Sequence, residues 1–335
     1  MKKLILTAAA AMMVLASCTK TTVESIDGPK EIAFKKIEGA MTKATTELTG
    51  TMGVFAFNHG TTQEYFSNTK FMSNGTAWAG GKYWPLNGNA LDFVVYAPYI
   101  PTPAASAEKN NIELSSRILT FTINESADNS SEQLDFLYGE EYYDSTDSAD
   151  DDALDDGYNK NSNNVTVNLK HALAKITVKA YANANSTYTI KSLSINNVPQ
   201  TGKIVVTYND DNIANPDEVG SVTCTPATTP VNKTYTYSLS TDLTTTPAEL
   251  GSCFAFPGND PTSLTITYTM AGHKDGSGNE IVMSSTISLT SNTESKWLSG
   301  NNYIYTLNLN ATEILFSPSV IEWTNQDQGI TNVTE

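Results

Sequence analysis

The chain has 335 residues, of which 39% are hydrophobic and 17% are charged, and its formal net charge is −16. This length allows two domains of ordinary size. A surface this acidic repels nucleic-acid phosphates and anionic lipid headgroups, which makes both poor partners.

The first residues have the pattern of an export signal. Lys2 and Lys3 precede an apolar run over residues 4–16, and Leu15-Ala16-Ser17-Cys18 follows. The run is too short to cross a hydrocarbon core of ~30 Å as a helix. Small residues before a cysteine resemble a bacterial lipobox. We therefore expect a lipoprotein signal peptide over 1–17 and an acylated Cys18; the alternative is an ordinary secreted protein with a chance cysteine.

Beyond the signal, the sequence predicts strands and no long helix. Apolar and polar residues alternate over Val165–Leu169, Ile176–Tyr181, Leu264–Tyr268 and Tyr303–Leu309, and a strand is also expected at Gly53–Phe57. Period two with β-branched and aromatic residues is typical of strands with one buried face. Turn sequences such as Asn87-Gly88-Asn89 separate them. The expected fold is all-β, built from antiparallel sandwiches.

An acidic segment interrupts this pattern at Asp144–Asn164. Seven aspartates fall within thirteen residues and are followed by Gly157 and several asparagines. Such charge density favours an exposed loop or linker. Calcium binding is the alternative, but the ligand spacing fails because Leu154 and Asn163 occupy positions that need ligands.

No residue set in the chain indicates catalysis, a cofactor or a metal. Apart from Cys18, only Cys224 and Cys253 are present, and the histidines are His59, His171 and His273. This spacing does not suit zinc. A Cys224–Cys253 disulfide is one possibility, and two buried thiols in separate strands is the other, which we favour. His171 is expected to begin a strand and to be structural.

Five stretches, in this order behind a lipobox, carry a family resemblance. They are Gly53–Phe57, Tyr83-Trp84-Pro85 with Leu91–Pro98, His171–Val178, Gly300–Leu307 and Val320–Trp323. Together the chain resembles the fimbrillin family, the protease-processed pilins of Bacteroidetes.

The resemblance implies an all-β fold of two transthyretin-like antiparallel β-sandwich domains. On this basis the expected divisions are a signal peptide at 1–17, a lipidated propeptide at 18–43, an N-terminal β-sandwich at 44–165 that includes the acidic loop 144–164, and a C-terminal β-sandwich at 166–335.

The resemblance also implies a route of assembly. The lipid on Cys18 attaches the precursor to the outer membrane, and an extracellular trypsin-like protease then cuts between Lys43 and Ala44. Lys43 departs from the arginine that is more usual in the family at this point. The cut removes the first strand and opens an apolar groove, which a strand from another pilin subunit fills at the cell surface.

Two other lysines are less favoured as cleavage sites. Lys35 and Lys36 directly follow the apolar stretch Ile32-Ala33-Phe34, which is a possible strand. Lys43 is the preferred site because the sequence around it is polar and has no strand pattern.

The expected donor strand lies near the C-terminus. Ile314, Phe316 and Val320 are two or four residues apart and share one face of the segment Ala311–Trp323. Pro318 suits a strand edge or a bend. The alternative, equally weighted, is that this segment completes the second sandwich of its own subunit.

The leading functional hypothesis is a fimbrial subunit, stalk or tip, that acts in adhesion toward an unidentified ligand. The alternatives are a surface glycan-binding lipoprotein and an uncut anchor subunit of the same family. A glycan binder would present exposed tryptophans, whereas we expect Trp78, Trp84, Phe93 and Tyr96 to pack in the first sandwich.

Overall fold

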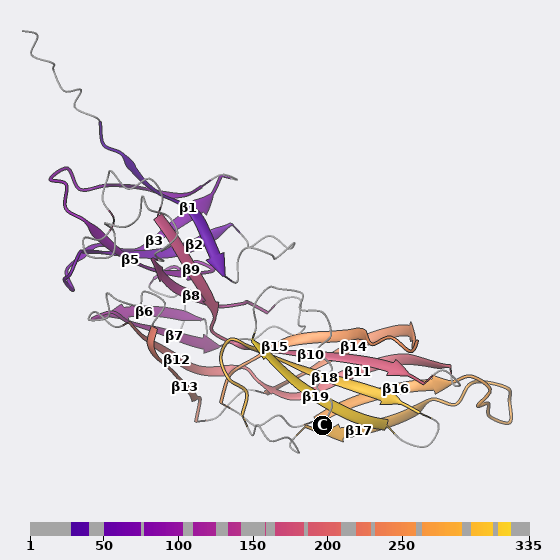
Figure 1. Cartoon of the computed structure of the whole chain (residues 1–335). Coiled ribbons are helices and arrows are strands. Elements are labelled where there is room, and N and C mark those ends of the chain that lie inside the picture. The colour runs from indigo at the N-terminus through magenta and orange to yellow at the C-terminus, as the bar shows by residue number, and fades with distance from the viewer. Residues whose placement is uncertain are drawn as a thin grey trace, which may run out of the picture.

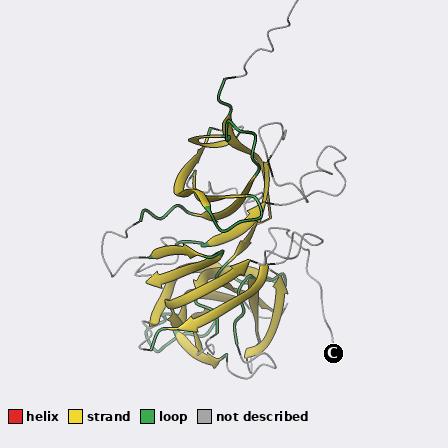
Figure 2. Ribbon diagram, turned by 90° about the vertical axis from the view of Figure 1, so that its left-hand side faces the viewer, coloured by secondary structure: helices red, strands yellow, loops and turns green. Residues whose placement is uncertain are grey.

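The computed structural model describes residues 28–39, 50–74, 77–102, 110–124, 133–141, 158, 165–183, 187–208, 219–228, 232–258, 263–289, 296–310 and 314–322. All regular elements in these ranges are β-strands, which confirms the all-β prediction. Within the same ranges, no helix has the length and hydrophobicity of a membrane span. Figure 2 shows a ring of strands above two packed layers of sheet.

The first unit is a closed barrel with strand order β1-β4-β3-β2-β5-β8-β9. Its strands are β1 (Glu31–Gly39), β2 (Thr51–Asn58), β3 (Glu64–Ser73), β4 (Trp78–Tyr83), β5 (Leu91–Ala97), β8 (Leu137–Glu141) and β9 (Val165–His171). Most neighbours are antiparallel, but β1 runs parallel to β9. Parallel pairing needs a long connection between the strands, and here all the other barrel strands lie between them in sequence. The barrel is the upper left part of the molecule in Figure 1.

A four-stranded sheet packs on the outside of the barrel, in the order β13-β12-β7-β6. It contains β6 (Asn111–Ser115), β7 (Ile118–Asn124), β12 (Thr201–Tyr208) and β13 (Val219–Pro226). Phe55 of β2 and Tyr96 of β5 point into the layer between barrel and sheet, where they meet Phe121 of β7 and Ile204 of β12. The strands β2 and β5 are therefore buried on both faces, so they read as continuous apolar runs rather than alternating ones.

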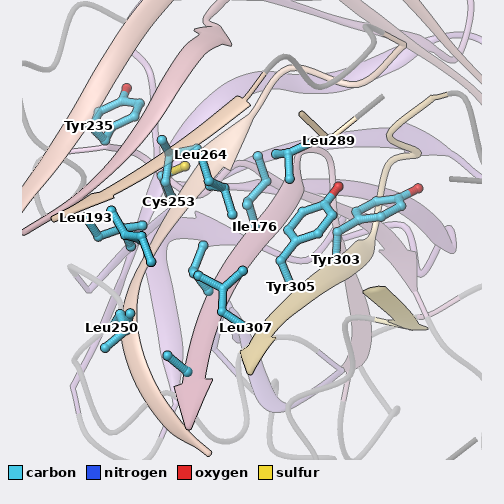
Figure 3. Packing of buried hydrophobic residues seen from close by; sticks show 14 of the residues in the cluster. Ile176, Leu193, Tyr235, Leu250, Cys253, Leu264, Leu289, Tyr303, Tyr305 and Leu307 are labelled. Atoms are coloured by element: carbon cyan, nitrogen blue, oxygen red, sulfur yellow. The ribbon is translucent and has the colours of Figure 1, made fainter. Parts of the chain in front are cut away.

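Two further sheets form a sandwich, with strand orders β15-β10-β18-β19 and β14-β11-β16-β17. Their strands are β10 (Ala174–Ala182), β11 (Tyr188–Pro199), β14 (Asn232–Asp242), β15 (Ala248–Ala255), β16 (Ser263–Met270), β17 (Met283–Ser288), β18 (Asn301–Leu309) and β19 (Ile314–Glu322). Alternate residues of both sheets fill the core, and Figure 3 shows Ile176, Leu193, Leu264 and Leu307 among them. The strands β10 and β18 form the second parallel pair.

The two halves of the chain are interleaved at their junction. Residues 201–226 follow β11 of the sandwich, yet β12 pairs with β7 from Ile118 to Asn124. A pair of buried amides reinforces the junction: Gln133 donates to Gln200 Oε1 at 3.0 Å and to the Phe254 carbonyl at 2.8 Å, and it accepts from the Phe254 N–H at 2.8 Å. The side chain of Gln133, which comes from the barrel half, therefore pairs with both backbone groups of Phe254 at the edge of β15.

Several sequence predictions can be compared with these strands. All five predicted strand stretches lie within β2, β9, β10, β16 and β18. His171 is buried beside Asp135 at 2.9 Å, as a structural histidine would be, but it ends β9 rather than beginning a strand. Ala174 begins the next strand, since residues 172–173 turn the chain from the barrel into the sandwich. Cys224 in β13 and Cys253 in β15 are free thiols in separate strands.

Candidate functional site

The strand β1 closes the barrel and forms the centre of the candidate site. Its side chains Ile32 and Phe34 are completely buried. The ring of Phe34 meets the rings of Phe71 and Phe93 edge to face, with centroid distances of 5.4 Å and 5.2 Å. Such aromatic contacts contribute beyond the burial of their area. The apolar core of the barrel is therefore built around two side chains that the N-terminal segment supplies.

The wall on one side of β1 is the antiparallel strand β4. Here Glu31 is paired with Tyr83, Ala33 with Ala79 and Phe34 with Trp78. Two further contacts fix the start of β1: the N–H of Gly81 donates to Glu31 Oε1 at 2.9 Å, and the N–H of Trp84 donates to the Lys30 carbonyl at 3.0 Å. On its other side β4 pairs with β3 only at Met72–Ala79 and Ser73–Trp78. Much of the ladder of β4 therefore depends on β1.

The opposite wall is β9, which runs parallel to β1. Pairing begins at Phe34–Val165 and continues from Lys36–Thr166 to Gly39–Leu169, with a shift of register between Phe34 and Lys36. A second irregularity lies between Glu31 and Ala33 on the β4 side. The ladder of β1 is thus interrupted once on each edge, and the burial of Ile32 and Phe34 adds to its attachment.

The core around Ile32 and Phe34 is lined by alternate residues of β2 and β5. Val54, Ala56, Phe93 and Val95 belong to this cluster. The intervening residues of the same strands face the outer sheet instead. Only every second residue of β2 and β5 therefore faces the core around β1, because a strand alternates its faces.

The predicted cleavage residues follow β1 in sequence. Lys43 and Ala44 lie outside the described residues, as does Cys18. The strand β1 ends at Gly39 and β2 begins at Thr51, so the segment that joins them contains Lys43. Lys35 and Lys36, the less favoured cleavage candidates, lie inside β1. A cut in the joining segment would leave β1 attached to the body by non-covalent contacts only.

The predicted donor residues form an edge strand in this monomer. The segment β19 pairs along its whole length with β18, from Leu309–Ile314 to Asn301–Glu322, and it ends the strand order of its sheet. The monomer thus has the arrangement in which Ile314 and Phe316 complete their own sheet. Val320 and Ile321 are exposed at 39% and 36%.

The aromatic landmarks serve packing. Trp84, Phe93 and Tyr96 are buried, and Trp78 packs half-buried against the barrel core. The one further described tryptophan, Trp297, is buried in the sandwich. In the described part of the chain, no tryptophan therefore forms an exposed platform of the kind that a glycan binder uses.

A polar cluster on the barrel rim also has a structural character. Asp92 is buried; its Oδ1 lies 2.6 Å from His59 Nδ1, and its Oδ2 accepts from the N–H of Gly60 at 3.1 Å and from Arg117. Arg117 also donates to the Thr61 carbonyl at 3.3 Å and lies over the ring of Phe57. The cluster ties the turns β2–β3 and β6–β7 together. Within the described ranges, no group of three or more His, Cys, Asp and Glu side chains is arranged to hold a metal.

The sequence indicated only part of this site. The possible strand at Ile32-Ala33-Phe34 is confirmed, and so is the strand at Val165–Leu169, but Glu31, the strand β4 and the position of β9 beside β1 were missed. The short, glycine-containing β4 has no alternating pattern that would reveal it. The parallel position of β9 depends on pairing between residues that are far apart in sequence.

Comparison with known proteins places the chain in a family. The family model described as Fimbrillin-like matches residues 40–323, most of the chain. No curated protein matches the sequence. A fimbrial protein from Bacteroides vulgatus is similar in structure with a TM-score of 0.56 and 16% identity, over 87% of this chain and 99% of that one. A candidate cell adhesion protein from Bacteroides uniformis is similar with a TM-score of 0.51 and 17% identity, over 88% and 99%. These likenesses show a shared fold, and the family match shows that the chain belongs to the Fimbrillin-like family, a family of structural rather than catalytic proteins.

Proposed function

We propose that this protein is a fimbrial subunit, stalk or tip, that is exported as a lipoprotein on Cys18 and assembled by proteolysis and strand exchange at the cell surface. The observation that carries the proposal is the position of β1. Ile32 and Phe34 complete the barrel core, and the segment that joins them to the body contains Lys43. The proposal includes two transthyretin-like domains, of which the first runs to the end of β9 at His171 and also contains β12 and β13.

Removal of β1 would create the acceptor site. The cavity left by Ile32 and Phe34 would expose Phe71 and Phe93, and the strands β4 and β9 would each lose a ladder. Fully burying one such side chain contributes about 1.5–3 kcal/mol, so an open groove is unfavourable in water. A strand from another subunit restores both the apolar contacts and the backbone pairing.

The first experiment determines the N-terminus of the surface protein in a Bacteroidetes host. We expect Ala44 as the first residue and multimers that survive mild detergent. Lys43→Ala should leave a lipidated monomer that begins at Cys18, while the control Lys43→Arg should be cut normally because a trypsin-like protease accepts both bases. A wild-type surface protein that begins at Cys18 while fimbriae are abundant would indicate the uncut anchor role instead.

The second experiment separates donation from acceptance. Ile314→Asp combined with Phe316→Asp places charges on the proposed donor strand and should stop a subunit from donating while its own groove remains able to accept. Ser319→Asp, at an exposed position of β19, is the matched control. We expect the double variant to cap multimers of the wild type. Identical monomer peaks for cut and uncut protein, together with polysaccharide binding, would favour the glycan-binding lipoprotein.

A further inference from the structure

The sequence of β1 recurs near the C-terminus. Glu31-Ile32-Ala33-Phe34 and Glu313-Ile314-Leu315-Phe316 are identical at three of four positions. Both stretches also end in Ile-Glu, at Ile37-Glu38 and Ile321-Glu322, and the second is two residues longer between the phenylalanine and the isoleucine. Since side chains alternate along a strand, a difference of two residues preserves the face on which each side chain lies.

Each identical position has a defined contact in β1. Glu31 Oε1 accepts the N–H of Gly81 at 2.9 Å, and Ile32 and Phe34 are completely buried. The differing position, Ala33, is only half-buried, and its partner Ala79 on β4 is half-buried as well. The repeat therefore retains the side chains that the barrel contacts and differs where the side chain has room. A general preference for strand formation does not explain why a glutamate recurs at Glu31 and Glu313, because glutamate is depleted in strands.

The repeat lies on an edge strand, which could leave its sheet without separating the other three strands. In the described part of the chain, β19 pairs with β18 alone, at the edge of its sheet. The barrel that contains β1 and the sheet that contains β19 lie in different halves of the molecule in Figure 1. Because of this separation, β19 of one chain cannot reach the β1 position of the same chain without leaving its half of the molecule.

We propose that the segment Glu313–Glu322 of a second copy of this chain takes the place of β1, in the same direction as β1 and in a fixed register. Glu313, Ile314 and Phe316 occupy the positions of Glu31, Ile32 and Phe34, and Leu315 lies opposite Ala79. This inference rests on the proposed strand exchange and names its partner. A chain whose donor segment matches its own acceptor groove assembles with itself, which is the property of a stalk subunit.

The test is a disulfide between subunits in the full chain. Ala33 and Ala79 are directly opposed in the antiparallel β1–β4 ladder, where Cα atoms lie about 4.5–5.5 Å apart, a separation that a disulfide spans. Ala79→Cys combined with Leu315→Cys, in a host strain without other fimbrial subunits, should give covalent multimers that all return to monomer on reduction. Both substitutions avoid the barrel core. Ala79→Cys with Ser319→Cys is the matched control and should give no covalent multimers.

The possible outcomes distinguish a failure of this inference from a failure of the proposed strand exchange. Detergent-resistant multimers without a disulfide between positions 79 and 315, or linked through position 319, would overturn the register while strand exchange stands. Multimers that form only when other fimbrial subunits are present would mean that the donor segment does not come from a second copy of this chain. A body that begins at Ala44 and stays monomeric under every condition would overturn strand exchange itself, and this inference with it.

Discussion

Gly53 of β2 lies against the phenol ring of Tyr96 on β5. A Cβ atom at Gly53 would come within 2.1 Å of Tyr96 Cε1 and 2.2 Å of Tyr96 Cζ. The ring is held in place, because its hydroxyl lies 2.6 Å from Asn68 Oδ1 and accepts the N–H of Ile100 at 3.1 Å. Two of the landmark stretches thus meet at this contact: a glycine on one strand makes room for a buried tyrosine on the next.

Gly53→Ala should therefore destabilise the protein, because neither the Tyr96 ring nor the backbone of β2 can withdraw. Overpacking of this kind costs about 1–3 kcal/mol. The control is Gly50→Ala, since nothing lies within 4 Å of its Cβ position. Urea unfolding of both variants measures the difference, and equal midpoints would mean that the ring has another position.

Phe34→Ala should lower the free energy of unfolding by about 3–5 kcal/mol, the usual cost of removing a buried phenylalanine. The reason is the loss of contacts with Phe71 and Phe93 in the barrel core. Ala33→Ser, one residue away and half-buried, is the control and should change little. If Phe34→Ala unfolds at the wild-type urea concentration, β1 does not contribute to the barrel as described.

Replacing Cys18 by Ala should abolish labelling with fatty acid and leave an unprocessed or mislocalised precursor. The reason is that acylation requires the sulfur that follows Leu15-Ala16-Ser17. Metabolic labelling of wild type and variant gives the answer. Cys224→Ala serves as the control for loss of an unrelated thiol, and fatty-acid labelling that persists in the Cys18 variant would contradict the lipoprotein assignment.

The two remaining thiols should behave as buried groups. Burial raises the pKa of the Cys224 thiol to about 11 and raises the pKa of the Cys253 thiol further. Because the thiolate is the reactive form, iodoacetamide should modify both slowly at pH 7 in folded protein and rapidly in urea. Dithiothreitol should leave the melting temperature unchanged, whereas a drop of several degrees would reveal a disulfide.

Deleting residues 144–156 should leave the folded core nearly intact. Residues 144–156 lie outside the described residues, between β8 and β9, and the deletion spares Tyr158, which is buried and bridges Leu91. Loop closure changes by only ~0.6 kcal/mol per doubling of length. Melting temperature should also be indifferent to millimolar calcium. A calcium-dependent rise of several degrees in the full chain, lost in the deletion variant, would identify a metal site in this segment.

The sequence predicted the strands better than their arrangement. Alternation marked Val165–Leu169 and Tyr303–Leu309 correctly, because each has one polar face. The parallel pairings of β1 with β9 and of β10 with β18 join residues far apart in the chain, which no local pattern encodes. The sequence also did not predict that β12 pairs with β7 of the barrel half, since the composition of β12 suits either unit.

The candidate site was predictable in part. Ile32 and Phe34 were recognisable as apolar residues two apart, and their complete burial agrees with a first strand that closes an apolar core. The contact of Glu31 with Gly81 was not recognisable, because it depends on a backbone N–H of a strand that lies fifty residues away. The cleavage residues Lys43 and Ala44 remain predictions.

The interleaved junction has a consequence for resistance to proteolysis. The chain passes between the barrel half and the sandwich half at three places: from β9 to β10, from β11 to β12 and from β13 to β14. A single nick in one of these connections leaves the other two intact, so the halves stay tethered. The two halves are thus held together by three covalent connections, whereas β1 is joined to β2 by one connecting segment, residues 40–50.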